Sequence, residues 1–171
     1  MQKIVNISIF DIEIDAIVNA ANSFLSGGGG VDGAIHAAAG PELYDACSKI
    51  GHCDVGKAVI TPGFNLKAKY IIHTVGPFYN HYDKETNEML LADCYRNSLN
   101  LAKKNGIKSI AFPCLSTGAY GYPLEEAAPI AIKTVSNWLK KNNDEMSVYL
   151  VCYTDREYEI YKGVYDELYR K

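Results

Sequence analysis

Residues 19–40 read NAANSFLSGGGGVDGAIHAAAG, and the interpretation of the whole chain starts from this stretch. The apolar run Ala16–Val18 before it predicts a buried strand, and the alanine-rich segment Val31–Ala39 predicts a helix. Four consecutive glycines, Gly27 to Gly30, lie between them. Because glycine has no side chain, the backbone N–H groups of such a loop can approach a bulky anion, and the following helix start adds a partial positive charge. The stretch therefore predicts a phosphate-sized anion site.

Asp32 and His36 are the polar residues of this helix, and their spacing of four places them on one face. Each part also has an ordinary structural explanation: a glycine run is often a flexible loop, an Asp is favoured at a helix start, and a lone His is usually a satisfied structural group. The order strand, Asn22, glycines, helix, Asp and His favours a site. It places the polar groups at the carboxyl end of a strand, where open α/β sheets bind ligands.

Length and composition indicate a single globular domain over residues 1–171. The chain is 48% hydrophobic and 22% charged, which is ordinary for such a domain. Its formal net charge of -3 makes nucleic acid an unlikely partner, so a bound phosphate has to be held by backbone amides and helix dipoles. No apolar run approaches the ~18 residues of a membrane helix, and no signal-peptide pattern is present, so we expect no membrane association.

The five cysteines are scattered, odd in number and without a CxxC pair, which argues against a disulfide framework or a structural zinc site. Cys47, His52 and Cys53 lie close together in sequence, but a fourth ligand at a known zinc spacing is missing. We therefore expect no structural zinc site and a cytoplasmic protein.

Strand and helix patterns alternate along the chain and predict a three-layer α/β/α domain with a mixed, mostly parallel central sheet. The first strand is a candidate for antiparallel pairing at an edge, Phe10–Glu13 reads as a loop, Pro129 is expected to kink or restart its helix, and Asp155 is expected to cap the last helix. The expected strands are residues 3–8, 16–20, 57–61, 69–75, 109–114 and 147–153. The expected helices are residues 31–39, 42–50, 87–104, 123–138 and 155–168.

A second glycine-bearing loop, Ser116–Tyr122 (STGAYGY), follows the strand at 109–114 and precedes Pro123. Two such loops facing each other can hold a pyrophosphate between them. Neither loop continues into GK[ST], as a nucleotide-triphosphatase loop does, and neither forms GxGxxG with an acidic residue about 20 positions later. An NTPase or a nicotinamide-dependent oxidoreductase is therefore disfavoured.

Four motifs together resemble the macrodomain family: NAAN at Asn19–Asn22, GGGGVDGAIH at Gly27–His36, IHTVGP at Ile72–Pro77 and STGAYGYP at Ser116–Pro123. The form GGGGVDGAIH resembles the MacroD-type branch, which contains ADP-ribosyl hydrolases and O-acetyl-ADP-ribose deacetylases. The resemblance runs from about Ile7 to the last helix. It implies the macrodomain fold, ADP-ribose and O-acetyl-ADP-ribose as ligands, and mono-ADP-ribosylated proteins as partners. It implies no metal and no organic cofactor.

The resemblance also implies a role for individual residues. Asp11, as a buried carboxylate, accepts a hydrogen bond from the adenine amino group beside the Ile12 backbone, and Tyr153 stacks on adenine. Asn22 positions the distal ribose, and Tyr120 packs over that ribose. Asp32 and His36 fall where this branch keeps its hydrolytic groups. The residues expected to surround the pyrophosphate and distal ribose are Gly29, Gly30, Val31, Gly33, Ser116, Thr117, Gly118, Ala119 and Tyr120.

Two positions depart from the family pattern. Phe10 stands where the family usually has Gly before the adenine-reading Asp, so the local turn is expected to differ. Ala37 stands where the branch often has Arg after the His, which removes any phosphate or protein contact made by that Arg.

Two functions are open at this level. One is a hydrolase that removes ADP-ribose from acidic side chains and deacetylates O-acetyl-ADP-ribose. Its candidate catalytic residues are Asn22, which holds the ribose, Asp32, which aims water, and His36, which is either catalytic or structural. The other is a module that binds ADP-ribose without cleaving it. Asp32 favours the hydrolase, because a pure binder needs the loops but not that carboxylate. A carboxylate at a helix start is expected to be stabilised as the anion and hence to be a weak base.

Overall fold

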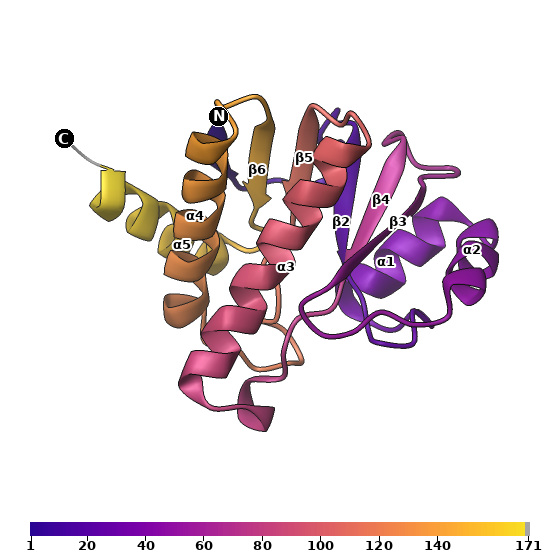
Figure 1. The fold of residues 1–171 in the computed structure, drawn as a ribbon, viewed down its shortest axis with the longest axis horizontal. Helices are drawn as coiled ribbons and strands as arrows, with labels where there is room; N and C mark the ends of the chain where they lie inside the picture. The colour runs from indigo at the N-terminus through magenta and orange to yellow at the C-terminus, as the bar shows by residue number, and fades with distance from the viewer. Residues whose placement is uncertain (170–171) are drawn as a thin grey trace.

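A computed structural model of the chain describes residues 1–169. In this part of the chain, six strands form one sheet with the order β1-β6-β5-β2-β4-β3, flanked by helices on both faces (Figure 1). The strands are β1 Gln2–Val5, β2 Ala16–Ala20, β3 Ala58–Pro62, β4 Tyr70–Thr74, β5 Ser109–Phe112 and β6 Ser147–Val151. The α-helices are α1 Gly30–Ala39, α2 Glu42–Ile50, α3 Lys84–Lys104, α4 Leu124–Lys141 and α5 Asp155–Tyr169.

The sheet is mixed and mostly parallel, as predicted, but the antiparallel strand is not the first one. β1 lies at an edge and pairs in parallel with β6, with Ile4 opposite Leu150. The antiparallel pair is β3 with β4 at the other edge. The short connection between β3 and β4 favours this arrangement, because a parallel pair needs a crossover connection of a dozen or more residues.

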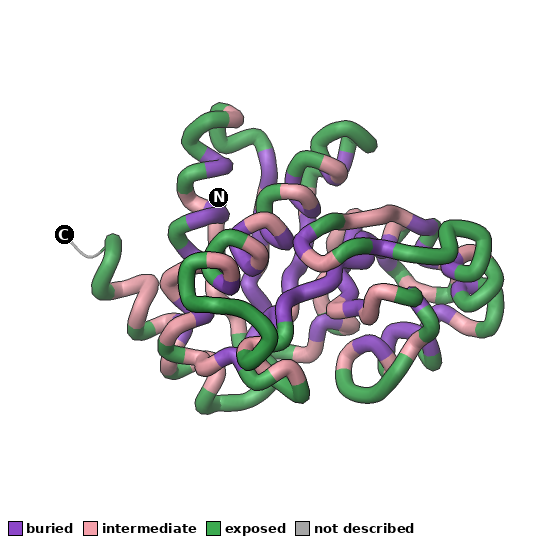
Figure 2. Tube along the Cα trace, turned by 60° about the horizontal axis from the view of Figure 1, so that its bottom comes forward, coloured by how far each residue is buried: buried purple, intermediate pink, exposed green. Residues whose placement is uncertain are grey.

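Alternate residues of the central strand β2 enter two different hydrophobic layers. Ile17 packs in a cluster with Ile35 of α1 and Leu43 of α2. Ala16 and Val18 belong to a larger cluster with α3, α4 and α5. The centre of the sheet is therefore buried on both faces, and Figure 2 shows the inner strands largely in the colour of buried residues, whereas the edge strands β1 and β3 are mostly of intermediate exposure.

The start of α5 differs from the prediction that Asp155 caps it. The Oγ1 of Thr154 accepts a hydrogen bond from the Glu157 N–H at 3.1 Å, and Glu157 Oε1 accepts one from the Thr154 N–H at 2.9 Å. This reciprocal pair is a capping box, which makes Thr154 the cap and Asp155 the first helical residue. Asp155 instead accepts a hydrogen bond from Asn6 at 2.9 Å.

Two other local predictions are also corrected. Pro129 lies inside α4, and the helix continues through it without a restart. The segment predicted as a loop from Phe10 begins as a short 3-10 helix, Ile9–Asp11, because the Ser8 hydroxyl accepts the Phe10 N–H at 3.3 Å. Within residues 1–169, no helix combines the length and apolarity needed to cross a bilayer.

Gly163 offers a test of how a glycine inside α5 affects stability. It lies inside the helix, and a Cβ added there meets nothing within 4 Å. We expect Gly163→Ala to raise the free energy of unfolding by about 0.5–1 kcal/mol, because glycine loses more backbone entropy than alanine on folding. Urea denaturation measures this. Gly106→Ala is the matched control: its space is equally open, but its φ of +71° makes alanine strained, so stability should fall.

Candidate active site

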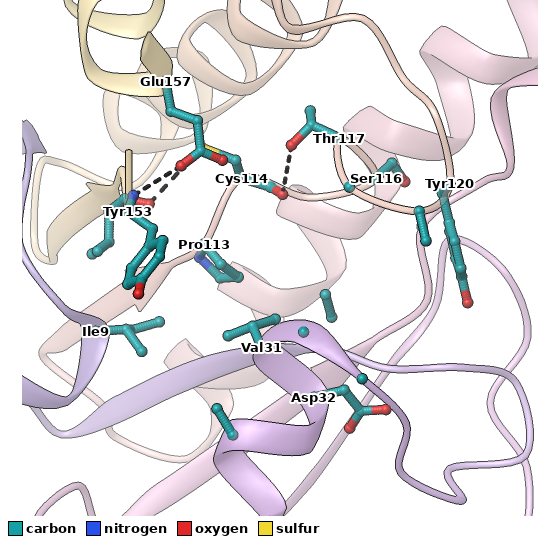
Figure 3. A pocket seen from close by; sticks show the side chains of 18 of the residues that line it. Ile9, Val31, Asp32, Pro113, Cys114, Ser116, Thr117, Tyr120, Tyr153 and Glu157 are labelled. Carbon is teal, nitrogen blue, oxygen red and sulfur yellow. Dashed lines mark hydrogen bonds between the residues drawn. The ribbon is translucent and has the colours of Figure 1, made fainter. Parts of the chain in front are cut away.

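A cleft of about 980 Å³ lies at the carboxyl ends of β1, β2, β5 and β6 (Figure 3). Its walls come from the segments that follow these strands, together with the glycine loop and the start of α1. None of the described residues that line it is Lys or Arg. An anion in this cleft is therefore bound by backbone N–H groups and helix starts rather than by cationic side chains.

The structure brings most of the predicted site residues together in this cleft. Those that line it are Asn22, Gly29, Gly30, Val31, Asp32, Ser116, Thr117, Gly118, Ala119, Tyr120 and Tyr153. Asp11, Ile12, Gly33 and His36 are not among its lining residues. Asp11 is exposed at the end of the 3-10 helix, so the expectation of a buried carboxylate is wrong for this position. Its contact with adenine stays a prediction.

The Asn22 side chain shapes the glycine loop. Its Oδ1 accepts hydrogen bonds from the N–H groups of Phe24 at 3.1 Å and Ser26 at 3.2 Å, and its Nδ2 donates to the Gly27 carbonyl at 3.0 Å. The loop then enters α1 through Gly30, whose φ of +57° favours glycine. Asn22 therefore acts at least as a loop organiser, and its contact with a ribose stays a prediction.

Asp32 is buried at the floor of the cleft, and one of its two oxygens is already engaged. Oδ1 accepts a hydrogen bond from Asn19 Nδ2 at 2.8 Å and lies 3.4 Å from His36 Nε2. Oδ2 faces the glycine loop, 3.5 Å from where a Cβ on Gly28 would lie. One carboxylate oxygen is thus held by the protein while the other is turned toward the loop.

The basicity of Asp32 differs from the prediction made from its place at a helix start. Burial raises the pKa of its carboxyl above the ordinary value, and this outweighs the lowering by the Asn19 hydrogen bond and by His36. Desolvation therefore dominates at this helix start. Asp32 is a better proton acceptor than its sequence position alone indicates.

His36 lies behind Asp32 and outside the cleft lining. It is only 2% exposed, and its ring packs against Tyr44 with centroids 4.2 Å apart. This position favours a role in holding Asp32 over direct contact with a ligand.

The second loop places Tyr120 opposite α1. The Tyr120 ring stacks on Phe78, with centroids 3.7 Å apart and planes 23° apart. Burial and the nearby Asp32 charge raise the pKa of the Tyr120 hydroxyl. Figure 3 shows Asp32 and Tyr120 on facing sides of the cleft. These two side chains therefore define one end of it.

Tyr153 and Glu157 lie at the other end (Figure 3). The Tyr153 side chain is 80% exposed, so its ring is open to stacking by a ligand. Glu157 Oε1 accepts the N–H of Tyr153 at 2.9 Å as well as that of Thr154, which fixes the backbone that carries the ring. The sequence analysis missed Glu157, although the T-x-x-E pattern at 154–157 signals it.

Asn19 is the second residue that the sequence analysis did not single out. Its amide contacts both Asp32 and, at 3.1 Å, His73 Nδ1. The available signal is a polar amide inside the apolar strand AIVNA, where an unpaired amide is costly.

As for metals, residues 1–169 contain no group of three or more His, Cys, Asp or Glu side chains placed to hold an ion.

Comparison with known proteins identifies the family. The Macro domain family matches residues 18–131, which is about two thirds of the chain and includes both loops and Asp32. The chain belongs to this family.

The relatives of this macrodomain include a human protein and a bacterial one. It is 50% identical over 159 residues to the ADP-ribose glycohydrolase MACROD2 of Homo sapiens, covering 92% of this chain but only 37% of the human protein. It is 54% identical over 158 residues to the O-acetyl-ADP-ribose deacetylase of Escherichia fergusonii, covering 90% of this chain and 88% of that protein.

Solved structures confirm the macrodomain fold. The Oceanobacillus iheyensis macrodomain with ADP superposes with a TM-score of 0.93 at 46% identity, covering 98% of this chain and 90% of the other. The Trypanosoma brucei macrodomain in complex with ADP-ribose gives a TM-score of 0.86 at 41% identity, covering 95% and 68%.

Gly33 tests how the glycine loop packs on α1. A Cβ at this position would lie 2.4 Å from the Gly28 carbonyl oxygen. We expect Gly33→Ala to lower the free energy of unfolding by about 1–3 kcal/mol, because backbone has to move to relieve the overlap. Gly29→Ala is the control, since a Cβ there meets nothing within 4 Å. Equal stability of the two variants in urea denaturation would contradict the close approach.

Proposed function

We propose that this macrodomain binds ADP-ribose, hydrolyses the bond that joins mono-ADP-ribose to acidic protein side chains, and deacetylates O-acetyl-ADP-ribose. The observation that carries the proposal is Asp32. Its carboxylate is buried, held through one oxygen and placed at the end of a cleft that no Lys or Arg among residues 1–169 lines. A module that only binds a diphosphate has no need of a buried negative charge at this place.

The relatives support the same activities. The human relative is named an ADP-ribose glycohydrolase, and the Escherichia fergusonii relative is named an O-acetyl-ADP-ribose deacetylase. The second relative is matched over most of its length, so the comparison does not depend on a further domain. The Trypanosoma brucei macrodomain supports ADP-ribose as the ligand class.

The cleft accommodates ADP-ribose in one direction. The adenine stacks on Tyr153, the pyrophosphate lies between the glycine loop and the second loop, and the distal ribose lies between Asp32 and Tyr120. The ring of Tyr120 is fixed by its stacking on Phe78 and limits the freedom of that ribose. Much of the rate gain then comes from positioning.

Hydrolysis requires water to be aimed at the ester between the distal ribose and the acidic group. In the proposed mechanism, the free oxygen of Asp32 accepts a hydrogen bond from this water and takes up one proton as the water oxygen bonds to the ester carbon that it attacks. The bond between that carbon and the bridging ester oxygen breaks, and the proton passes from Asp32 to this departing oxygen. The products are free ADP-ribose and the carboxylic acid. A carboxyl pKa raised by burial serves this role better than an ordinary Asp, because a general base works best near the operating pH.

Two further elements belong to the proposal. The protein partners are mono-ADP-ribosylated proteins, which present the ester at the Asp32 end of the cleft. The proposed location is the cytoplasm: the five cysteines are free thiols in the structure, as is usual in a reducing compartment.

Substitution of Asp32 separates an enzyme from a binding module. We expect Asp32→Ala and Asp32→Asn to lower turnover by at least about 100-fold, as for loss of a general base. ADP-ribose affinity should be kept or should rise slightly, because the charge that repels the phosphates is removed while the backbone donors stay. Release of ADP-ribose from a glutamate-modified acceptor gives turnover, and calorimetry gives affinity.

The two Asp32 variants control for each other. The Asn side chain keeps the shape and the acceptor for Asn19, whereas Ala removes both, so a shared loss of turnover identifies the charge as the cause. Turnover within a few-fold of wild type in Asp32→Asn would remove Asp32 as the base. Binding without any hydrolysis by the wild type would instead favour the non-catalytic ADP-ribose-binding module.

The donor set of the cleft predicts how activity responds to chelators. Among the described residues, its lining offers two carboxylates, Asp32 and Glu157, at opposite ends and no imidazole. We expect hydrolysis to be unchanged by excess EDTA, because no set of ligands for zinc or magnesium is assembled there. Loss of activity on EDTA treatment that is reversed by one specific divalent ion would contradict this expectation.

A further inference from the structure

A chain of buried polar side chains extends from Asp32 into the sheet. Asn19 on β2 and His73 on β4 are opposite each other in the parallel register, and both are completely buried. Thr61 on β3 continues the chain and is 4% exposed. Among the described strand residues, the other buried positions are apolar except Thr74, whose hydroxyl donates to the Lys57 carbonyl, so the cost of burying these groups needs an explanation.

The Asn19 amide uses both hydrogens of its NH₂ group. One is donated to Asp32 Oδ1 at 2.8 Å and the other to His73 Nδ1 at 3.1 Å. Its carbonyl oxygen is buried and has no hydrogen-bond partner within residues 1–169. If the amide rotated by half a turn, this carbonyl would face the Asp32 carboxylate and repel it. The orientation of one amide therefore decides whether Asp32 is supported or opposed.

His73 determines this orientation through its tautomer. To accept from Asn19, Nδ1 has to carry a lone pair, so the proton is on Nε2, which donates to the Thr61 hydroxyl at 2.9 Å. Burial, with His36 nearby, lowers the pKa of His73 to about 3. The ring is therefore neutral at physiological pH, and Nδ1 stays an acceptor.

We propose that His73 is a positioning residue: its Nδ1 lone pair fixes the Asn19 amide, which in turn holds one oxygen of Asp32 and leaves the other aimed at the cleft. The proposal rests on the hydrolase function proposed above. It assigns to the histidine of the sequence IHTVGP a role beyond filling the sheet, and the direction of every hydrogen bond from Asp32 to Thr61 is consistent with it.

Few titratable groups face this chain. Asp32 is close to His36 on its own helix. Burial raises the pKa of the Cys47 thiol on α2 and of the Tyr120 hydroxyl on the second loop, and the charge of nearby Asp32 raises both further. His73 is affected by His36. Neither Cys47, whose pKa is about 11, nor Tyr120 titrates below pH 8. If a His73 substitution shifts the acid limb of the pH profile of kcat, the shift thus reports on Asp32. His36 is the one other group to which such a shift has to be compared.

Two substitutions of similar size separate positioning from packing. In His73→Asn, the Oδ1 of the new side chain replaces Nδ1 as an acceptor for Asn19 and the Thr61 contact is lost. In His73→Gln, the side chain reaches Thr61 but leaves no acceptor at the Nδ1 position. A structural role alone predicts equal defects, whereas positioning predicts that only His73→Asn keeps turnover.

We expect His73→Gln to lower kcat about tenfold, the factor associated with a lost hydrogen bond to a charged group, with ADP-ribose affinity within about twofold of wild type. His73→Asn should stay within about threefold of wild type in both quantities. The acid limb of the kcat profile should move to higher pH in His73→Gln, because Asp32 loses the hydrogen bond that opposes the effect of burial. Equal kcat in the two folded variants, or equal loss accompanied by weaker ADP-ribose binding, would overturn the proposal.

Nuclear magnetic resonance gives a test that does not depend on turnover. The ¹⁵N shifts of the His73 ring in the wild type should report the neutral Nε2–H tautomer from pH 5 to 8, and the ¹³C shift of the Asp32 carboxyl should titrate at higher pH in His73→Gln than in His73→Asn. An Nδ1–H tautomer, or an unchanged Asp32 titration, would overturn the proposal even in an active enzyme. If the wild type binds but does not hydrolyse, the function proposed above fails while these two measurements still decide the role of His73. The wild-type measurement also decides it if the variants do not fold.

Discussion

The hydrogen bond from the Asn19 amide to the Asp32 carboxylate joins the central strand of the sheet to the helix that carries the site. β2 is fixed on both sides by parallel neighbours, β5 and β4, so Asn19 cannot move without disturbing the sheet. α1 is comparatively short and starts in a glycine loop. Its register against the sheet therefore depends on this buried contact together with the packing of Ile35. The position of the Asp32 carboxylate is thereby tied to the central strand of the sheet.

Around the Asp32 carboxylate, backbone groups and side chains of the cleft have different roles. In the proposed function, the backbone N–H groups of two loops recognise the anion. Asn22 shapes the first loop, and the Thr117 hydroxyl, which donates to the Cys114 carbonyl at 3.1 Å, shapes the second. The two ends of the cleft rely on aromatic rings, Tyr120 and Tyr153. The ring of Tyr120 is held by stacking on Phe78, and the backbone of Tyr153 is held by Glu157. A preorganised site requires such fixed contacts behind the loops that form it.

The sequence was sufficient for the layer architecture, the mostly parallel sheet and most of the cleft lining, because hydrophobic periodicity and glycine loops at strand ends are local signals. It was not sufficient where pairing is non-local. β1 and β6 are separated by more than 140 residues, and nothing in residues 1–8 indicates a parallel partner. The pKa of Asp32 was misjudged for a similar reason: the helix start is visible in the sequence, but the depth of burial that outweighs it is not. His73 was seen only as part of a motif, since its neighbours Asn19 and Thr61 come from other strands.

The absence of Lys and Arg from the described lining of the cleft has a consequence for how such a protein changes over evolutionary time. Point substitutions readily delete a cationic side chain, but they cannot delete a backbone N–H except by introducing proline. Ligand binding through backbone N–H groups is therefore robust to substitutions in the loops. The proposed hydrolysis, in contrast, depends on the single Asp32 carboxylate, which one nucleotide change can remove. In this architecture, few substitutions separate an enzyme from a receptor for the same ligand. Equally few restore the enzyme as long as Asn19 and His73 are kept.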